Sequence, residues 1–218
     1  MQVHTSLNVS KVIVNGFLLV ILAGALLLWL CNNYYYELPL SFVDALFIST
    51  SGVCVTGLTT VDISSGFGRG TQMILLMLVQ IGGLGFMTGM MLLSIAVRRR
   101  IGIKSRMSFL GGLGIDGIQG AIKLLHIVLC YTLVLEIAGA VALYFGFRAG
   151  GSEVGFSLYN AVFHAVSAFC NAGFSPIQYG LRGYYTSFIV PGTIMALIVL
   201  GGIGFPVFAE CWEFIFHR

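Results

Sequence analysis

Four long apolar runs separated by polar residues dominate the hydrophobic pattern of the chain. They cover approximately residues 12–31, 71–97, 124–147 and 186–212. A helix needs about 20 predominantly apolar residues to cross a bilayer, and each run is long enough to do so. We therefore expect an all-α membrane protein with four membrane-spanning helices.

Two further apolar segments do not fit as full spans. Residues 39–61 and 156–177 are each interrupted near the middle by Gly, Ser, Thr or Asn. This pattern predicts a short helix followed by a non-helical turn. Non-helical backbone at membrane depth is tolerated only where protein buries it or where it lines a wet cavity. Each segment is therefore expected to be a re-entrant pore loop, and an ordinary structural re-entrant turn is the alternative.

The chain also matches itself at a nearly constant offset. The matching pairs are residues 22–25 with 137–140, 44–47 with 160–163, Ser51 with Ser167, Cys54 with Cys170, Gly57 with Gly173, and 81–86 with 200–205. The unit of span, pore loop and span is thus used twice in one orientation, similar to the pore module of potassium channels. Parallel membrane repeats are related by an axis along the membrane normal, which can hold a pore. We expect one repeat in residues 1–104, a cytoplasmic linker in 105–122 and the second repeat in 123–218.

Composition and charge agree with a multi-pass membrane protein. Charged residues make up 9% of the chain and hydrophobic residues 58%, whereas a typical soluble domain is about 25% charged. The basic residues gather near membrane ends rather than on one face, so nucleic-acid binding is not expected. On this topology one side carries Lys11, Arg98, Arg99, Arg100, Lys104, Arg106, Lys123 and Arg218, and the other carries Arg69, Arg148 and Arg182. The richer side is cytoplasmic, so we expect both termini inside and both loops entering from outside. The expected location is the plasma membrane.

The loops contain a candidate ion filter. Its predicted residues are Cys54, Val55, Thr56 and Gly57 in the first loop and Cys170, Asn171, Ala172 and Gly173 in the second. The preceding short helix would aim its carbonyl end at mid-membrane, where the helix dipole favours a cation. Glycine permits positive φ and close backbone approach, so carbonyl oxygens could replace the hydration shell of an ion. No acidic residue lies in either segment, which favours a monovalent cation such as K⁺ over a divalent one.

Several polar residues near the loops are candidates for support. Ser51 and Ser167 occupy matching positions, and Asp44 and Asn160 lie at equivalent expected helix starts, where capping or anchoring is their simplest role. His164 is expected to form hydrogen bonds in the second short helix. Glu136 lies inside the third span, and pairing with a polar group on a neighbouring helix is favoured over ion coordination.

No other pattern indicates chemistry. Residues 112–117 match GxGxxG, but the strand and soluble βαβ unit that a dinucleotide site needs are missing. No set of side chains converges as in a catalytic site, so an enzyme is not expected. The five cysteines form no CxxC pair and indicate neither a disulfide framework nor a metal site.

The loop sequences resemble a known family. Residues 50–58 (TSGVCVTGL) look like the first selectivity-filter loop of the Trk/Ktr/HKT superfamily of potassium transporters, residues 171–175 like the second, and residues 82–86 like the inner helix between them. The closest similarity is to the membrane subunit of bacterial Ktr. The resemblance implies filter glycines at Gly57 and Gly173. In that superfamily glycine at the first position goes with potassium conduction, and serine there goes with sodium selectivity.

The resemblance also implies partners. These are a second copy of the subunit in a homodimer and a cytoplasmic ring that itself binds ATP, ADP or NAD, with no cofactor in this chain. Proteins of the superfamily carry four repeats around one pore, whereas this chain has two. We therefore expect either the N-terminal half of a longer protein or two copies that meet. A non-conducting structural or regulatory subunit and a sodium-permeable transporter are the alternative functions.

Overall fold

The computed structural model describes residues 3–98 and 117–203, and this part of the chain is helical and contains no strand. The prediction of an all-α chain is thus confirmed for the described residues. In chain order the elements are α1 (Val3–Leu30), the π-helical turn η1 (Cys31–Tyr35), α2 (Phe42–Val53), α3 (Ile63–Gly66), α4 (Arg69–Arg98), α6 (Gly117–Ala149), α7 (Val154–Phe169), the 3₁₀ turn η3 (Gly180–Tyr184) and α8 (Ile189–Ile203).

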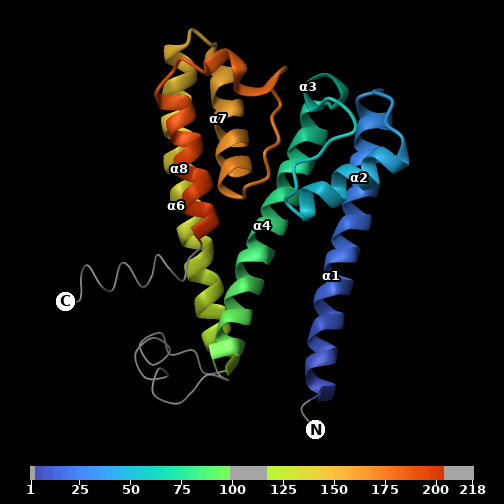
Figure 1. The fold of residues 1–218 in the computed structure, drawn as a ribbon. Coiled ribbons are helices and arrows are strands. Elements are labelled where there is room, and N and C mark those ends of the chain that lie inside the picture. The colour runs from blue at the N-terminus through green and yellow to red at the C-terminus, as the bar shows by residue number, and fades with distance from the viewer. Residues whose placement is uncertain (1–2, 99–116, 204–218) are drawn as a thin grey trace, which may run out of the picture.

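The helices form two units of similar internal order. Helices α1, α2 and α4 pack against one another, as do α6, α7 and α8, and α4 also contacts α6 and α7. In Figure 1 the short helices α2 and α7 start near the end of the molecule where α1 and α6 finish, and the chain after each returns toward that end. Each unit therefore consists of a long helix, a short helix, a non-helical return and a further helix.

The helix boundaries differ from the predicted spans mainly at their ends. Helix α1 begins at Val3, before the apolar run, and α6 begins at Gly117, within the predicted linker. The described part of α8 ends at Ile203, whereas the predicted span continues to residue 212. Three predicted features lie largely outside the described residues. They are most of the linker, the GxGxxG pattern apart from its last glycine, and the cluster of basic residues at 99–106.

Two helices in the described part are long and apolar enough to cross a bilayer, Val14–Tyr35 and His126–Ala149. Their outer faces carry exposed aliphatic side chains, such as Leu19 (68% exposed) and Val134 (65% exposed). Helix α4 has 30 residues, which at about 1.5 Å per residue gives roughly 45 Å. Exposed apolar faces on helices of this length suit contact with lipid.

Aromatic residues gather where α1 ends. The ring of Trp29 packs edge-on against Tyr34 at 5.7 Å and against Phe42 at 6.4 Å between centroids. Tryptophan and tyrosine are enriched at the boundary between hydrocarbon and water, because one part of each ring is apolar and another is polar. This end of the molecule is therefore suited to a membrane–water interface.

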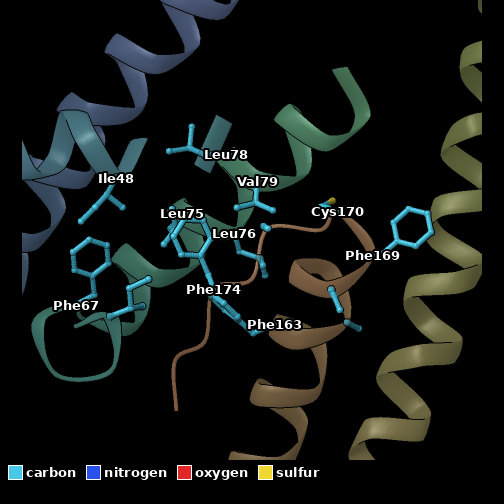
Figure 2. Packing of buried hydrophobic residues seen from close by; sticks show 14 of the residues in the cluster. Ile48, Phe67, Leu75, Leu76, Leu78, Val79, Phe163, Phe169, Cys170 and Phe174 are labelled. Atoms are coloured by element: carbon cyan, nitrogen blue, oxygen red, sulfur yellow. The ribbon is translucent and has the colours of Figure 1, made fainter. Parts of the chain in front are cut away.

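The apolar core passes from one unit to the other through α4. Figure 2 shows Leu75, Leu76, Leu78 and Val79 of α4 in the centre, with Ile48 on the side of the first unit and Phe163, Cys170 and Phe174 on the side of the second. Phe169 points away toward α6, where its ring lies 6.0 Å from that of Tyr131. The last residues of α7 are thus held between α4 and α6.

A buried asparagine fixes the end of α1. Asn32 is fully buried in the π-helical turn, and its Nδ2 donates to the carbonyl oxygens of Leu38 at 3.1 Å and Gly66 at 2.9 Å. Its Oδ1 accepts the N–H of Gly68 at 3.2 Å. The side chain therefore satisfies its buried polar atoms while it ties α1 to the connection between α3 and α4.

Candidate cation site

Both short helices end in the same hydrogen-bonded turn. After α2, the N–H of Thr56 donates to the carbonyl of Ser51 at 2.9 Å, and that of Val55 to Gly52 at 3.2 Å. After α7, the corresponding bonds run from Ala172 to Ser167 at 2.8 Å and from Asn171 to Ala168 at 3.0 Å. This pair of bonds is the Schellman motif, which closes helix C-termini. The two predicted filter segments thus leave their helices along the same path.

The residue after the cap is left-handed in both turns. Glycine usually occupies this position, but here it is Val55, with φ 56°, and Asn171, with φ 61°. Asparagine adopts this conformation more readily than most residues, whereas a β-branched residue there is a genuine outlier. Such strain costs about 1–3 kcal/mol and persists only when the surroundings impose it. Two residues further on, Gly57 and Gly173 again have positive φ, at 74° and 77°.

The backbone carbonyls of these segments have no hydrogen-bond donor. Within the part of the chain that the structure describes, nothing donates to the carbonyl oxygens of residues 54–57 or 170–173. Carbonyl groups in folded proteins are nearly always paired, either within the protein or with solvent. These oxygens are therefore free to coordinate water or a cation.

The two candidate support serines reach across their turns. The Oγ of buried Ser51 accepts the N–H of Leu58 at 2.8 Å and the hydroxyl of Thr56 at 3.0 Å. The hydroxyl of buried Ser167 donates to the carbonyl of Phe174 at 2.9 Å. Each serine, at the end of its helix, thus bonds to the residue just beyond the predicted filter segment. These bonds restrain the segment at both ends.

The expectation that Asn160 lies at the start of α7 and caps it is wrong. Helix α7 begins at Val154 with Glu153 at the cap position, so Asn160 lies inside the helix and cannot cap it. Asn160 is instead buried, and its Nδ2 donates to the carbonyl of Phe156 at 2.9 Å. The discrepancy arises because the internal repeat aligns Asn160 with Asp44, whereas α7 begins further before Asn160 than α2 begins before Asp44.

Asp44 takes part in the cap of α2, although Ser41 is the cap residue. The Oγ of Ser41 accepts the N–H of Asp44 at 3.1 Å and donates to its carboxylate at 2.5 Å. Ser41 thereby satisfies one of the N–H groups that a helix leaves free at its start. The side chain of Asp44 orients the cap rather than supplying it.

His164 connects α7 with the chain beyond the second segment. Its Nδ1 lies 2.8 Å from the carbonyl oxygen of Asn160, and its Nε2 lies 2.9 Å from the Oγ of Ser175. Because a carbonyl only accepts, Nδ1 carries the proton in this arrangement. The side chain thus has the hydrogen-bonding role expected from the sequence.

Glycines allow close backbone contacts at the site. A Cβ at Gly82 of α4 would collide with the carbonyl of Val53, and one at Gly201 of α8 with the carbonyl of Phe169. Val53 and Phe169 are the last residues of α2 and α7, so both units use a glycine at the same place. Gly57 lies against the carbonyl of Ala172, which brings the two segments side by side.

A hollow of about 470 Å³ opens beside the segments. Its lining includes Gly57, Thr60, Asp62, Gly173 and Ser175. The carboxylate of Asp62 accepts the N–H of Ser64 at 2.9 Å, and this bond holds the pKa of Asp62 below the ordinary value of 3.8. A negative charge therefore stands at the rim of the hollow at neutral pH, where it attracts cations.

The sequence predicted a polar partner for Glu136 on a neighbouring helix, and this partner is Gln80. The polar chain that continues from Gln80 to the second segment was not predicted. The thiol of Cys170 donates to Oε1 of Gln80 at 3.8 Å, and Nε2 of Gln80 donates to Oε2 of Glu136 at 3.3 Å. This chain connects α4, α6 and the start of the second segment. Gln80 could have been recognised from the sequence, because it is a polar residue within the apolar run at 71–97 and Glu136 in another run needed a polar neighbour.

Comparisons with known proteins agree on one family. The model of the TrkH family, described as a cation transport protein, matches residues 4–218. The potassium/sodium uptake protein NtpJ of Enterococcus hirae is 35% identical over all of this chain and 48% of its own length. The Ktr system potassium uptake protein B is 37% identical in Bacillus subtilis, over 90% of this chain and 44% of its own length. The Vibrio alginolyticus protein of the same name is 33% identical, over 93% and 44%.

The chain thus spans about half the length of the curated relatives it matches, and the matched part is their N-terminal half.

Proposed function

The chain belongs to the TrkH family of cation transport proteins, and we propose that it supplies two pore loops of a potassium pathway across the plasma membrane. The observation that carries this proposal is the pair of segments at residues 54–57 and 170–173, which share one backbone geometry and have carbonyl oxygens without donors. Such oxygens can replace the hydration shell of a monovalent cation.

The short helices contribute electrostatically. Each aligned helix carries a partial negative charge at its C-terminus, and α2 and α7 both end at a proposed filter segment. A cation would enter through the hollow beside Asp62 and then meet the carbonyls of both segments. Two loops surround only part of an ion. The rest of a longer protein or a second copy of this chain would provide the remaining two.

The proposed orientation rests on the charge pattern, and the proposed partners rest on the family resemblance. The excess of basic residues on one side supports a cytoplasmic location for both termini and the linker, with the loops open to the outside. The proposed complex is a homodimer of membrane subunits on a cytoplasmic ring that binds ATP, ADP or NAD. The names of the Ktr relatives, which describe a potassium uptake system, support an assembly of more than one component.

A second candidate function is uptake of sodium as well as potassium. The printed name of the NtpJ protein includes both ions. The family resemblance associates glycine at position 57 with potassium. A side chain there would also collide with the Ala172 carbonyl that lines the proposed path. Selectivity then depends on the number and spacing of the carbonyls.

The test is ion uptake in a bacterium that lacks its own potassium uptake systems. The chain is expressed in two settings, first alone and then together with the C-terminal half of a relative. The Gly57→Ser variant is tested in both settings. We expect growth at low potassium in at least one setting, and Gly57→Ser should lower the ratio of rubidium to sodium uptake. Absence of flux in both settings, with the chain present in the membrane, would favour a non-conducting subunit. Equal uptake of both ions by the unaltered chain would favour the second candidate.

A further inference from the structure

Glu136 is a buried acid that the proposed ion path does not use. It lies within the helix stretch that is long enough to cross a membrane, and 6% of its surface is exposed. Its Oε2 accepts a hydrogen bond from Gln80 at 3.3 Å. Its Oε1 is buried and has no hydrogen-bond partner among the described residues. A buried carboxylate oxygen without a donor is strongly unfavourable if the group carries charge.

A second buried oxygen without a partner lies nearby on the same helix. Thr132 precedes Glu136 by one turn, and residues four apart are neighbours on one helix face. Thr132 is 1% exposed, and its Oγ1 likewise bonds to nothing in the described part of the chain. The two oxygens do not bond to each other either, so the Thr132 hydroxyl does not supply the donor that an ionised Glu136 Oε1 would need.

No described cation is placed to neutralise Glu136. The described side chains of α4 include one charged residue, Arg69, which lies over the ring of Tyr159 instead. Helix α8 carries no titratable residue between Ile189 and Ile203. On α7, Tyr159 bonds to Gln72 and His164 has partners at both ring nitrogens, and just beyond the helix Cys170 bonds to Gln80. A proton is therefore the charge balance that these residues allow.

We propose that Glu136 is a proton-binding site, with a proton on Oε1 and a neutral carboxyl that holds Gln80 against Cys170. When the O–H bond breaks, the proton passes to water and leaves a negative charge beside the Gln80 amide. Gln80 then turns both amide hydrogens toward the carboxylate and its bond from Cys170 weakens. The second filter segment begins at Cys170, so its position would depend on this proton.

The protonation can be tested without transport. We would record infrared spectra of the whole chain in lipid vesicles while the pH is raised from neutral. The comparison uses Glu136→Gln, which keeps the shape of the neutral side chain, and Glu153→Gln at the exposed cap of α7 as the matched control. We expect a carboxylic C=O band at neutral pH that is lost in Glu136→Gln and kept in Glu153→Gln.

The link to the filter segment has its own signal. The S–H stretch of Cys170, assigned by its loss in Cys170→Ser, should shift as the C=O band disappears at high pH, and it should stay constant in Glu136→Gln. The proposal is overturned if no C=O band depends on Glu136 at neutral pH. It is also overturned if that band titrates while the S–H band remains fixed.

The effect on ion passage rests on the proposed function and is measured separately. Rubidium uptake by the unaltered chain, in the cellular setting that supports flux, should fall several-fold over the pH range in which the C=O band is lost. Uptake by Glu136→Gln should not change over that range. Flux without a C=O band that depends on Glu136 would reject the proton site and support the proposed transport function. A C=O band of Glu136 that titrates, with no flux in any setting, would support the proton site and reject the proposed transport function.

Discussion

Replacing Gly57 or Gly173 by alanine separates backbone strain from contact between the two segments. Gly57 and Gly173 have nearly the same φ, 74° and 77°. Alanine in the left-handed region costs roughly 1–2 kcal/mol, and about 0.4–1 kcal/mol is recovered because alanine restricts the unfolded chain. These two contributions are equal at both positions, so they cancel in a comparison of the variants.

The surroundings of the two glycines differ. A Cβ at Gly57 would collide with the backbone carbonyl of Ala172, whereas one at Gly173 would have nothing within 4 Å. Overpacking against atoms that cannot easily move costs about 1–3 kcal/mol. Gly57→Ala should therefore reduce the free energy of unfolding by about 1–3 kcal/mol more than Gly173→Ala does, a difference of roughly five- to 150-fold in the unfolding equilibrium.

The measurement is unfolding of the purified chain in mild detergent micelles by titration with sodium dodecyl sulfate, followed by circular dichroism. The unaltered chain and both variants are measured side by side. Equal losses of stability in the two variants would refute the close approach of Gly57 to Ala172. A larger loss in Gly173→Ala would refute the open surroundings of Gly173.

Three further predictions use the same preparation. Gly82→Ala and Gly201→Ala should each lower the free energy of unfolding by about 1–3 kcal/mol, because the new Cβ meets the carbonyl of Val53 or Phe169. A Cβ at Gly192 would have nothing within 4 Å, so the control Gly192→Ala should stabilise α8 by about 0.5–1 kcal/mol. Equal losses of unfolding free energy at Gly82, Gly201 and Gly192 would contradict the close backbone contacts. Asn32→Ala removes the three hydrogen bonds of a buried side chain and should lower the free energy of unfolding by roughly 2–4 kcal/mol, measured by thermal unfolding. A loss no larger than that of Thr186→Ala, at an exposed position, would rule out this role. For Asp62 the folded pKa lies below 3.8, so its stabilising effect is present above the unfolded pKa and is lost as pH falls through the folded pKa. A carboxyl resonance of Asp62 that titrates at or above 3.8 in NMR would contradict the cap.

Local patterns in the sequence predicted much of the first unit. A short helix was expected at the start of residues 39–61 and is found at Phe42–Val53. A cluster of glycine, serine and threonine in the middle of this segment ends the helix. The positions of Ser51 and Ser167 were predicted by the internal repeat. Both bond across their turns in the structure. These features depend on residues close in the sequence, so the sequence carries them directly.

Other features depend on contacts between distant residues. The bond from Gln80 to Glu136 joins residues 56 positions apart, and apolar periodicity does not specify which polar residues of two helices meet. The early start of α7 places Asn160 inside the helix, although the internal repeat aligned it with Asp44 near a helix start. A match between repeats preserves the fold more closely than the helix ends, because helix ends depend on local caps.

The left-handed conformation of Val55 was also beyond prediction, and its cause shows how the site is built. A valine discourages this conformation, so the sequence alone favours another path after α2. The bonds from Val55 to Gly52 and from Thr56 to Ser51, with the two bonds that Ser51 accepts, outweigh this preference. The same turn forms at Asn171, where the side chain is easier to accommodate. Two unlike residues held in one conformation indicate that the turn itself is required. A rigid turn fixes the carbonyls before an ion arrives, and preorganisation of this kind lowers the cost of binding.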